Sequence, residues 1–250
     1  MRPTVFVHGN PETAAIWGPL IEVLDLDDVV TLSPPGFGAP LPAGFGSTSD
    51  DYLAWLVNEL ERMPQPVDLV GHDWGGGHVI RVVIERSDLV SSWVTDIAGC
   101  MAPDYVWHDM ARIWQTSGAG EEAVAAMLAT SLPDRVQMYE SLGMTAEVAL
   151  EVARATNEEM GNSILALYRS AAQPAMAQLG ARLSEASGRP GLVVIPTEDP
   201  YTGGEDRARW AADRAGAQVA VLPGLGHWWM MQDPDVGAAA LRSFWSSLDR

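Results

Sequence analysis

Four short segments of this chain carry the residue types that nucleophilic catalysis uses. In the first, an apolar run at 67–70 enters a Gly-His-Asp-Trp-Gly turn with Asp73 at its centre. Small residues on both sides let the chain turn sharply, which holds the central side chain on a strained backbone at the end of a strand. An ionised Asp is a nucleophile at pH 7 and can displace a leaving group from an alkyl carbon, because its ordinary pKa is about 3.9. The alternative is that Asp73 only caps the following helix.

The other three segments supply groups that would assist such a nucleophile. The turn at 8–11, His-Gly-Asn-Pro, can offer a backbone N–H to a developing oxyanion, and the Asn10 amide can donate to a bound anion. Asp199 lies in an acidic loop at 196–201, and His227 lies in a glycine-rich loop at 223–229. Each has an ordinary alternative: a plain turn, a solvated acidic loop and a loop histidine.

Their order along the chain connects these segments. Asp73, Asp199 and His227 each follow a run with strand character, in the order nucleophile, acid, base. Because the carboxyl ends of parallel strands meet at one edge of a sheet, we expect the three side chains to lie together.

The elements that must position these residues alternate between strands and helices. Residues 4–7, 29–32, 67–70, 93–98, 192–195 and 219–222 are rich in Val, Leu and Ile without two-residue alternation, which predicts buried parallel strands. Helical spacing follows at 49–60, 74–86, 203–216 and 234–248. The alternation predicts an α/β fold with a doubly wound, mostly parallel sheet. Residues 101–182 show helical spacing throughout, so we predict a helical cap inserted into a core of 1–100 and 183–250.

Composition excludes several classes of function. The chain has 250 residues, 33 acidic against 15 basic, and a net charge of −18, which disfavours nucleic acid as a partner. All basic residues are Arg, so Schiff-base and phosphate-loop lysines are absent. The single Cys100 cannot form an internal disulfide and is expected to be a buried thiol. No apolar run is long enough for a membrane span, and the N-terminal run is too short for a signal peptide, so we expect a cytoplasmic protein without membrane contact.

Over essentially its whole length the sequence resembles the α/β-hydrolase superfamily. Its Gly-His-Asp-Trp-Gly-Gly segment at 71–76 resembles the branch with an aspartate nucleophile, which contains epoxide hydrolases and haloalkane dehalogenases. The resemblance implies an alkyl ester on Asp73, hydrolysed by water that His227 activates with the help of Asp199. It implies backbone N–H groups of Asn10 and Trp74 as the oxyanion hole, and it implies neither a metal nor an organic cofactor.

Two features resemble epoxide hydrolases and one resembles dehalogenases. Gly-His-Trp at 226–228 resembles the histidine motif of epoxide hydrolases, and Tyr168 before Arg169 resembles their cap tyrosine, which activates the epoxide oxygen. Asn10 together with Trp74 resembles the halide-binding pair of dehalogenases. We therefore predict an epoxide hydrolase, with a haloalkane dehalogenase as the alternative and a non-catalytic binding protein as a minor one. An esterase is disfavoured because the chain has no Gly-X-Ser-X-Gly segment.

The sequence also departs from epoxide hydrolases. A second cap tyrosine is expected within 104–115, where Tyr105 lies early and Trp107 or Trp114 offers an indole N–H instead. The strand before His8 is the first in the chain, whereas family members usually have two more. Five tryptophans near the proposed site, with the methionines of the insert, predict an apolar pocket for a small hydrophobic or aromatic substrate: Trp74, Trp107, Trp114, Trp228 and Trp229.

Overall fold

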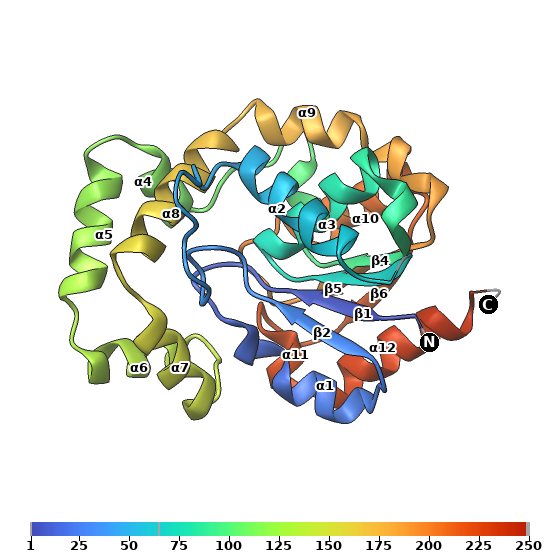
Figure 1. Ribbon diagram of the computed structural model, residues 1–250, viewed down its shortest axis with the longest axis horizontal. Coiled ribbons are helices and arrows are strands. Elements are labelled where there is room, and N and C mark those ends of the chain that lie inside the picture. Colours follow the sequence, from blue (N-terminus) through green and yellow to red (C-terminus); the bar gives the residue numbers. More distant parts are fainter. Residues whose placement is uncertain (1, 65, 249–250) are drawn as a thin grey trace.

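The computed structural model describes residues 2–64 and 66–248 and contains one parallel sheet (Figure 1). Its strand order is β2-β1-β3-β4-β5-β6, and every neighbouring pair is parallel. The strands are β1 (Thr4–Val7), β2 (Val29–Leu32), β3 (Val67–Gly71), β4 (Val90–Thr95), β5 (Gly191–Pro196) and β6 (Gln218–Leu222).

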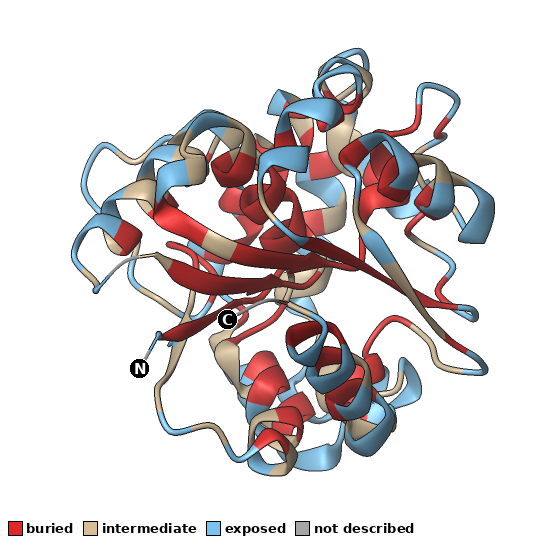
Figure 2. Cartoon of the chain, turned by 90° about the vertical axis from the view of Figure 1, so that its right-hand side faces the viewer, coloured by how far each residue is buried: buried red, intermediate tan, exposed pale blue. Residues whose placement is uncertain are grey.

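Helices cover both faces of the sheet, as the sequence predicted (Figure 1). One face carries α2 (Ser49–Glu61), α3 (Trp74–Glu85) and α10 (Glu205–Ala215), and the other carries α1 (Gly18–Leu24), α11 (Trp229–Gln232) and α12 (Pro234–Ser246). Alternate strand residues therefore enter different cores: Val5 and Val7 pack with the first set of helices, while Phe6 packs with the second. Both positions must be apolar, which explains the missing alternation in the sequence and the largely buried central strands in Figure 2.

Two strands are less buried than the sequence predicted. Strand β2 is half-buried with Thr31 exposed, and β6 is buried only at Leu222. Both lie at the edges of the sheet, where one side of the strand lacks a neighbour. Their Val-rich composition resembles that of the central strands, so composition alone did not separate edge from centre.

The predicted strand at 93–98 was misplaced: β4 begins at Val90 and ends at Thr95. The polar Ser92 hid its start, although this side chain is fully buried and donates a hydrogen bond of 2.6 Å to Asp68 on β3. The apolar residues after Asp96 belong instead to a 3₁₀ turn, Ala98–Met101, which leaves the sheet. Further short 3₁₀ segments are Ala14–Trp17, Ser87–Leu89 and Leu183–Gly188.

Between β4 and β5 the described residues form helices and no strand, as predicted for the insert. The helices are α4 (Asp109–Gln115), α5 (Ala119–Ala129), α6 (Leu132–Ser141), α7 (Ala146–Ala155), α8 (Glu158–Ser170) and α9 (Ala175–Ala181). Helices α4–α8 lie beyond one end of the sheet and form a cap, whereas α9 runs back over the core (Figure 1). The boundaries at 101 and 182 stay a prediction.

Polar residues begin the cap helices. Ser131, Thr145 and Asn157 each accept a hydrogen bond from a backbone N–H in the first turn of α6, α7 and α8. Such caps stabilise a helix by about 1 kcal/mol each, and they set where the apolar face of each helix starts. Among the described residues, no helix is both long enough and apolar enough to cross a membrane.

Candidate active site

Asp73 stands on a strained turn between β3 and α3. Its backbone has φ 47° and ψ −129°, a combination that residues with a side chain rarely adopt. The turn packs tightly against β1, because a Cβ at Gly75 would lie 2.2 Å from the carbonyl oxygen of Val7. Asp73 occupies the N-cap position of α3, yet its side chain makes no capping hydrogen bond. The simple helix-cap alternative therefore does not account for this residue.

The carboxylate of Asp73 is held by backbone from another strand end. The Asn10 backbone N–H donates to Asp73 Oδ2 at 3.0 Å, and the Asp73 N–H donates to Asp96 Oδ1 at 3.0 Å. Gly9 allows this approach, since a Cβ there would lie 2.2 Å from Oδ2. Burial raises the pKa of Asp73 to about 6, against the opposing effects of His227 and the Asn10 N–H.

His227 and Asp199 form the predicted pair at the ends of β6 and β5. His227 Nδ1 lies 2.8 Å from Asp199 Oδ2, and Asp199 Oδ1 accepts the Tyr201 N–H at 2.8 Å. Burial alone would lower the pKa of His227, but the Asp199 carboxylate beside it raises that pKa above its usual value. The same ion pair outweighs burial at Asp199 and lowers the pKa of that carboxyl.

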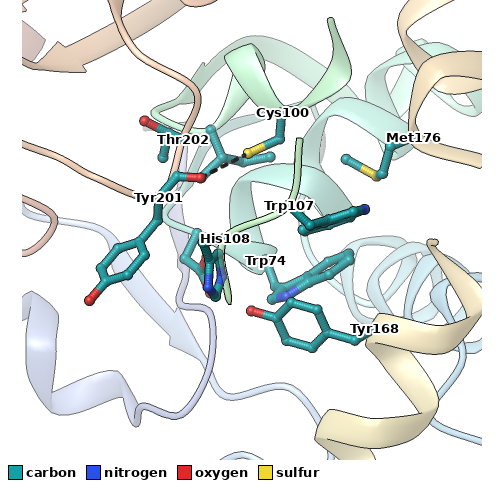
Figure 3. Close-up of a pocket in the computed structure, with 10 residues that line it drawn as sticks. Trp74, Cys100, Trp107, His108, Tyr168, Met176, Tyr201 and Thr202 are labelled. Carbon is teal, nitrogen blue, oxygen red and sulfur yellow. Dashed lines mark hydrogen bonds between the residues drawn. The ribbon is translucent and has the colours of Figure 1, made fainter. Parts of the chain in front are cut away.

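One cavity of about 550 Å³ brings most of the predicted site residues together. Its lining includes Asn10, Asp73, Trp114, Tyr168, His227 and Trp228. A smaller compartment of about 20 Å³, room for roughly one water, adjoins Asp73 and Tyr168 and is lined by Trp74 and Trp107 (Figure 3). Asp199 lines neither space and lies behind His227.

The Asn10 side chain is buried without a partner. It is 5% exposed, and neither its Nδ2 nor its Oδ1 has a hydrogen bond among the described residues. A buried amide without partners costs free energy, about 1–3 kcal/mol per unpaired group. Because Asn10 lines the cavity, a bound ligand can satisfy this amide.

Tyr168 reaches the site from the cap helix α8. It is 4% exposed, and its ring packs edge-on against Trp74 with ring centroids 5.1 Å apart (Figure 3). Burial, with the Asp73 carboxylate nearby, raises the pKa of Tyr168 well above its usual value, while a hydrogen bond with Trp74 acts in the opposite direction. The phenol of Tyr168 therefore keeps its proton at neutral pH.

A buried charge network, which the sequence did not predict, lies beneath Asp73. His72 lies between two carboxylates, with Nδ1 2.5 Å from Asp96 Oδ2 and Nε2 3.1 Å from Glu12 Oε1. Burial opposes the charge on His72, but the two carboxylates raise its pKa well above the usual value. Burial likewise works against the Glu12 carboxylate, yet the His72 charge lowers the pKa of Glu12 to about 2. In the sequence, the signal for this network was the pair of acidic residues Glu12 and Asp96, each of which follows a strand end.

This network joins the elements that carry the site. Glu12 also accepts the Gly9 N–H at 3.2 Å and the Trp228 indole N–H at 2.6 Å, and Asp96 accepts the Trp229 indole N–H at 2.8 Å. The ends of β1, β3, β4 and the histidine loop are thereby held together. The network positions the Asp73 turn and the residues beside His227 without touching the cavity itself.

Glu12, His72 and His227 are also close enough to act as metal ligands, with ligand atoms within 4.8 Å of one another. A metal would need both histidines neutral, whereas the pKa values of both are raised. The ion pairs already described account for the proximity of these groups. Cys100 borders the small compartment, but burial raises the pKa of its thiol beyond the range of a reactive thiolate.

Two of the possible second cap donors are directed elsewhere. The Tyr105 hydroxyl donates to the backbone oxygen of Tyr201 at 2.7 Å. The Trp107 indole N–H is buried without a hydrogen bond, and in Figure 3 its nitrogen points away from Tyr168. His108, which no sequence motif singled out, lines both the cavity and the compartment.

A strained turn carrying a carboxylate, a backbone N–H from the first strand end and an acid–histidine pair thus meet at one edge of the sheet. The chain belongs to the alpha/beta hydrolase family, whose sequence model matches residues 4–240. No curated protein sequence matches the chain significantly.

Solved structures with the same fold have several different activities in their names. A haloalkane dehalogenase variant from Bradyrhizobium elkanii has TM-score 0.72 and 18% identity, covering 100% of this chain and 92% of its own. E-2-(acetamidomethylene)succinate hydrolase has TM-score 0.73 and 16% identity, covering 98% and 92%. The enol-lactonase from Burkholderia xenovorans has TM-score 0.70 and 16% identity, covering 99% and 92%. At these identities the likeness establishes the fold alone.

Proposed function

We propose that this hydrolase opens an epoxide to a vicinal diol through an ester on Asp73. The observation that carries the proposal is Tyr168, a buried phenol that lines the same cavity as Asp73 and keeps its proton for a ligand. An epoxide oxygen needs such a donor, because it leaves as an alkoxide. The reacting part of the substrate is a small hydrophobic or aromatic epoxide group, in keeping with the apolar lining of the cavity, and the expected location is the cytoplasm.

The reaction has two steps. In the first, an Asp73 carboxylate oxygen attacks a ring carbon, the carbon–oxygen bond of the epoxide breaks, and Tyr168 donates its proton to the released oxygen. In the second, His227 takes a proton from water, and the resulting hydroxide attacks the carbonyl carbon of the ester, while backbone N–H groups of Asn10 and Trp74 hold the oxyanion. The ester carbon–oxygen bond then breaks, the departing diol oxygen takes the proton from His227, and the Asp73 carboxyl gives its proton to Tyr168, which restores all three groups.

The charges around His227 suit its role as the base of the second step. The Asp73 carboxylate is one of the groups that raise the pKa of His227. Forming the ester neutralises Asp73, so this contribution disappears and the pKa of His227 falls. The histidine thus becomes available as a base at the stage where water must be activated.

We also propose His108 as the second donor to the epoxide oxygen. Its Nδ1 accepts the Ala111 N–H at 3.2 Å at the start of α4, so in the neutral ring the proton is on Nε2. Burial and the neighbouring His227 lower the pKa of His108, which keeps the ring neutral at pH 7. His108 packs edge-on against Tyr168, with ring centroids 6.3 Å apart, so both donors border the same space.

The proposal predicts an unusual pH dependence of ester formation. Because the pKa of Asp73 is raised to about 6, the nucleophile is protonated below this pH and the rate falls about tenfold for each pH unit. The rate rises with pH and levels off above about 7. Single-turnover measurements of ester formation across this range check the expectation. A rate that declines only near pH 4, where an ordinary aspartate titrates, contradicts the raised pKa.

Tyr168→Phe separates the epoxide proposal from its alternative. Removing the phenol should slow ester formation from an epoxide by about 100-fold, a typical loss of general-acid assistance, while leaving attack on a haloalkane nearly unchanged. Single-turnover rates with matched aryl epoxide and benzylic bromide substrates measure both. An unchanged epoxide rate would mean that Tyr168 serves only packing. Tyr139→Phe, a buried cavity tyrosine on α6, is the matched control.

A haloalkane dehalogenase is the second candidate, and the Asn10 amide favours it. The unpartnered Nδ2 of Asn10 can donate to a departing halide. The second halide donor would be the Trp74 indole, which lines the small compartment and not the cavity that Asn10 lines. For this reason epoxide opening is preferred. Halide release from haloalkanes at a rate above that of diol formation would reverse the order.

A further inference from the structure

The cavity extends from Asp73 along two helices of the cap. The cavity is lined by Ala123, Ala126 and Met127 of α5 and by its C-cap residue Thr130. The last three follow Ala123 by three, four and seven residues, so one face of the helix borders the space. Two alanines on that face leave room beside the helix. A wall of this kind fits an elongated apolar group better than a compact one.

Helix α6 brings one charged residue into this otherwise largely apolar lining. Arg135, Met138, Tyr139 and Leu142 line the cavity, and Met138 and Leu142 are exposed where the cavity meets solvent. Among the described lining residues, Arg135 is the one side chain with a permanent positive charge. In a chain of net charge −18, a cation in an apolar cavity is a distinctive feature.

Arg135 is anchored by backbone rather than by a carboxylate. Its Nε donates to Thr130 O at 3.2 Å, and its Nη1 donates to Ala153 O and Thr156 O at 3.0 Å each. No ion pair or hydrogen bond joins Arg135 to a carboxylate within 2–64 and 66–248, and Nη2 has no hydrogen bond there. The guanidinium is therefore held in one orientation, with its charge uncompensated by an acidic side chain and one amino group available.

We propose that the substrate is an amphiphile with a terminal carboxylate, which binds Arg135 while its apolar chain lies along α5. A carboxylate is attracted by Arg135 and repelled by Asp73, so the two charges orient the ligand with its reactive carbon towards the nucleophile. The identity of that reactive group rests on the proposed function. The carboxylate site rests on Arg135 and the cavity, and binding tests it without turnover.

The experiment compares the binding of decanoate and decan-1-ol, two probes with the same chain and different heads, by titration calorimetry. The wild-type protein should bind decanoate more tightly. Arg135→Gln, which keeps an amide for the backbone carbonyls, should weaken decanoate about 10- to 100-fold and change decan-1-ol less than about threefold. Arg135→Lys, which keeps the charge, should bind decanoate with an affinity between those of the wild-type protein and Arg135→Gln.

Two outcomes overturn the inference. Equal weakening of both probes in Arg135→Gln would show that Arg135 only supports α5 and α7. Equal affinity of the wild-type protein for both probes would exclude a carboxylate site even where Arg135→Gln does not fold. A failure of the proposed function would be recognised separately, because no ester would form on Asp73 while the protein still bound the carboxylate.

Discussion

Asp73→Ala should reduce turnover to below about 1% of the wild-type rate, since Asp73 is the one carboxylate among the described residues that line the cavity. Cys100, the alternative soft nucleophile, has a raised pKa and remains a thiol at neutral pH. The loss should be the same for epoxide and haloalkane substrates, because both depend on the same carboxylate. Steady-state rates with either substrate measure it, and residual activity above about 1% would contradict the assignment of Asp73.

The stability of this variant provides its control. Burial raises the pKa of Asp73 to about 6, so the folded protein loses stability as the pH rises from about 4 to 6, and the penalty persists above pH 6. Ala carries no such charge. The melting temperature of Asp73→Ala at pH 8 should therefore equal or exceed that of the wild type, which shows that lost activity is not lost folding.

His227→Gln should convert the enzyme into a stable ester. Gln can still hydrogen-bond Asp199 but cannot take the proton of water, so hydrolysis of the intermediate should slow by about 100-fold or more while Asp73 still attacks. Intact mass measures the adduct. A gain equal to the whole epoxide supports epoxide opening, and a gain equal to the haloalkane minus hydrogen halide supports dehalogenation.

Two conditions make this experiment decisive. The His227 charge lowers the pKa of Asp73, so the variant should be incubated near pH 8, where the carboxylate stays ionised without that help. The double variant Asp73→Ala with His227→Gln is the control and should gain no mass. Continued turnover by His227→Gln at the wild-type rate would show that another group activates the water.

The cap helices show what helical periodicity in a sequence predicts and what it leaves open. Spacing predicted helices between β4 and β5, where the described residues form helices and no strand, because each helix must bury one face and its apolar residues recur accordingly. The same periodicity does not say against what a helix packs. The cap tyrosine Tyr168 and the cavity-lining Arg135 have ordinary helical positions in the sequence, and only the packing of α6 and α8 gives them a shared cavity with Asp73.

The sequence alone determined which side chains lie on turns and at strand ends, because their positions follow from the local backbone. Small residues around Asp73 demand the strained turn, and strand ends followed by Asp199 and His227 demand a common sheet edge, so residue type and spacing are enough to identify these side chains. What only the tertiary structure decided is pairing across the fold. Glu12, His72 and Asp96 are far apart in the chain, and nothing local marks them as partners. The energies of these ion pairs come from burial and from the attraction between the charges, and both arise only once β1, β3 and β4 lie side by side.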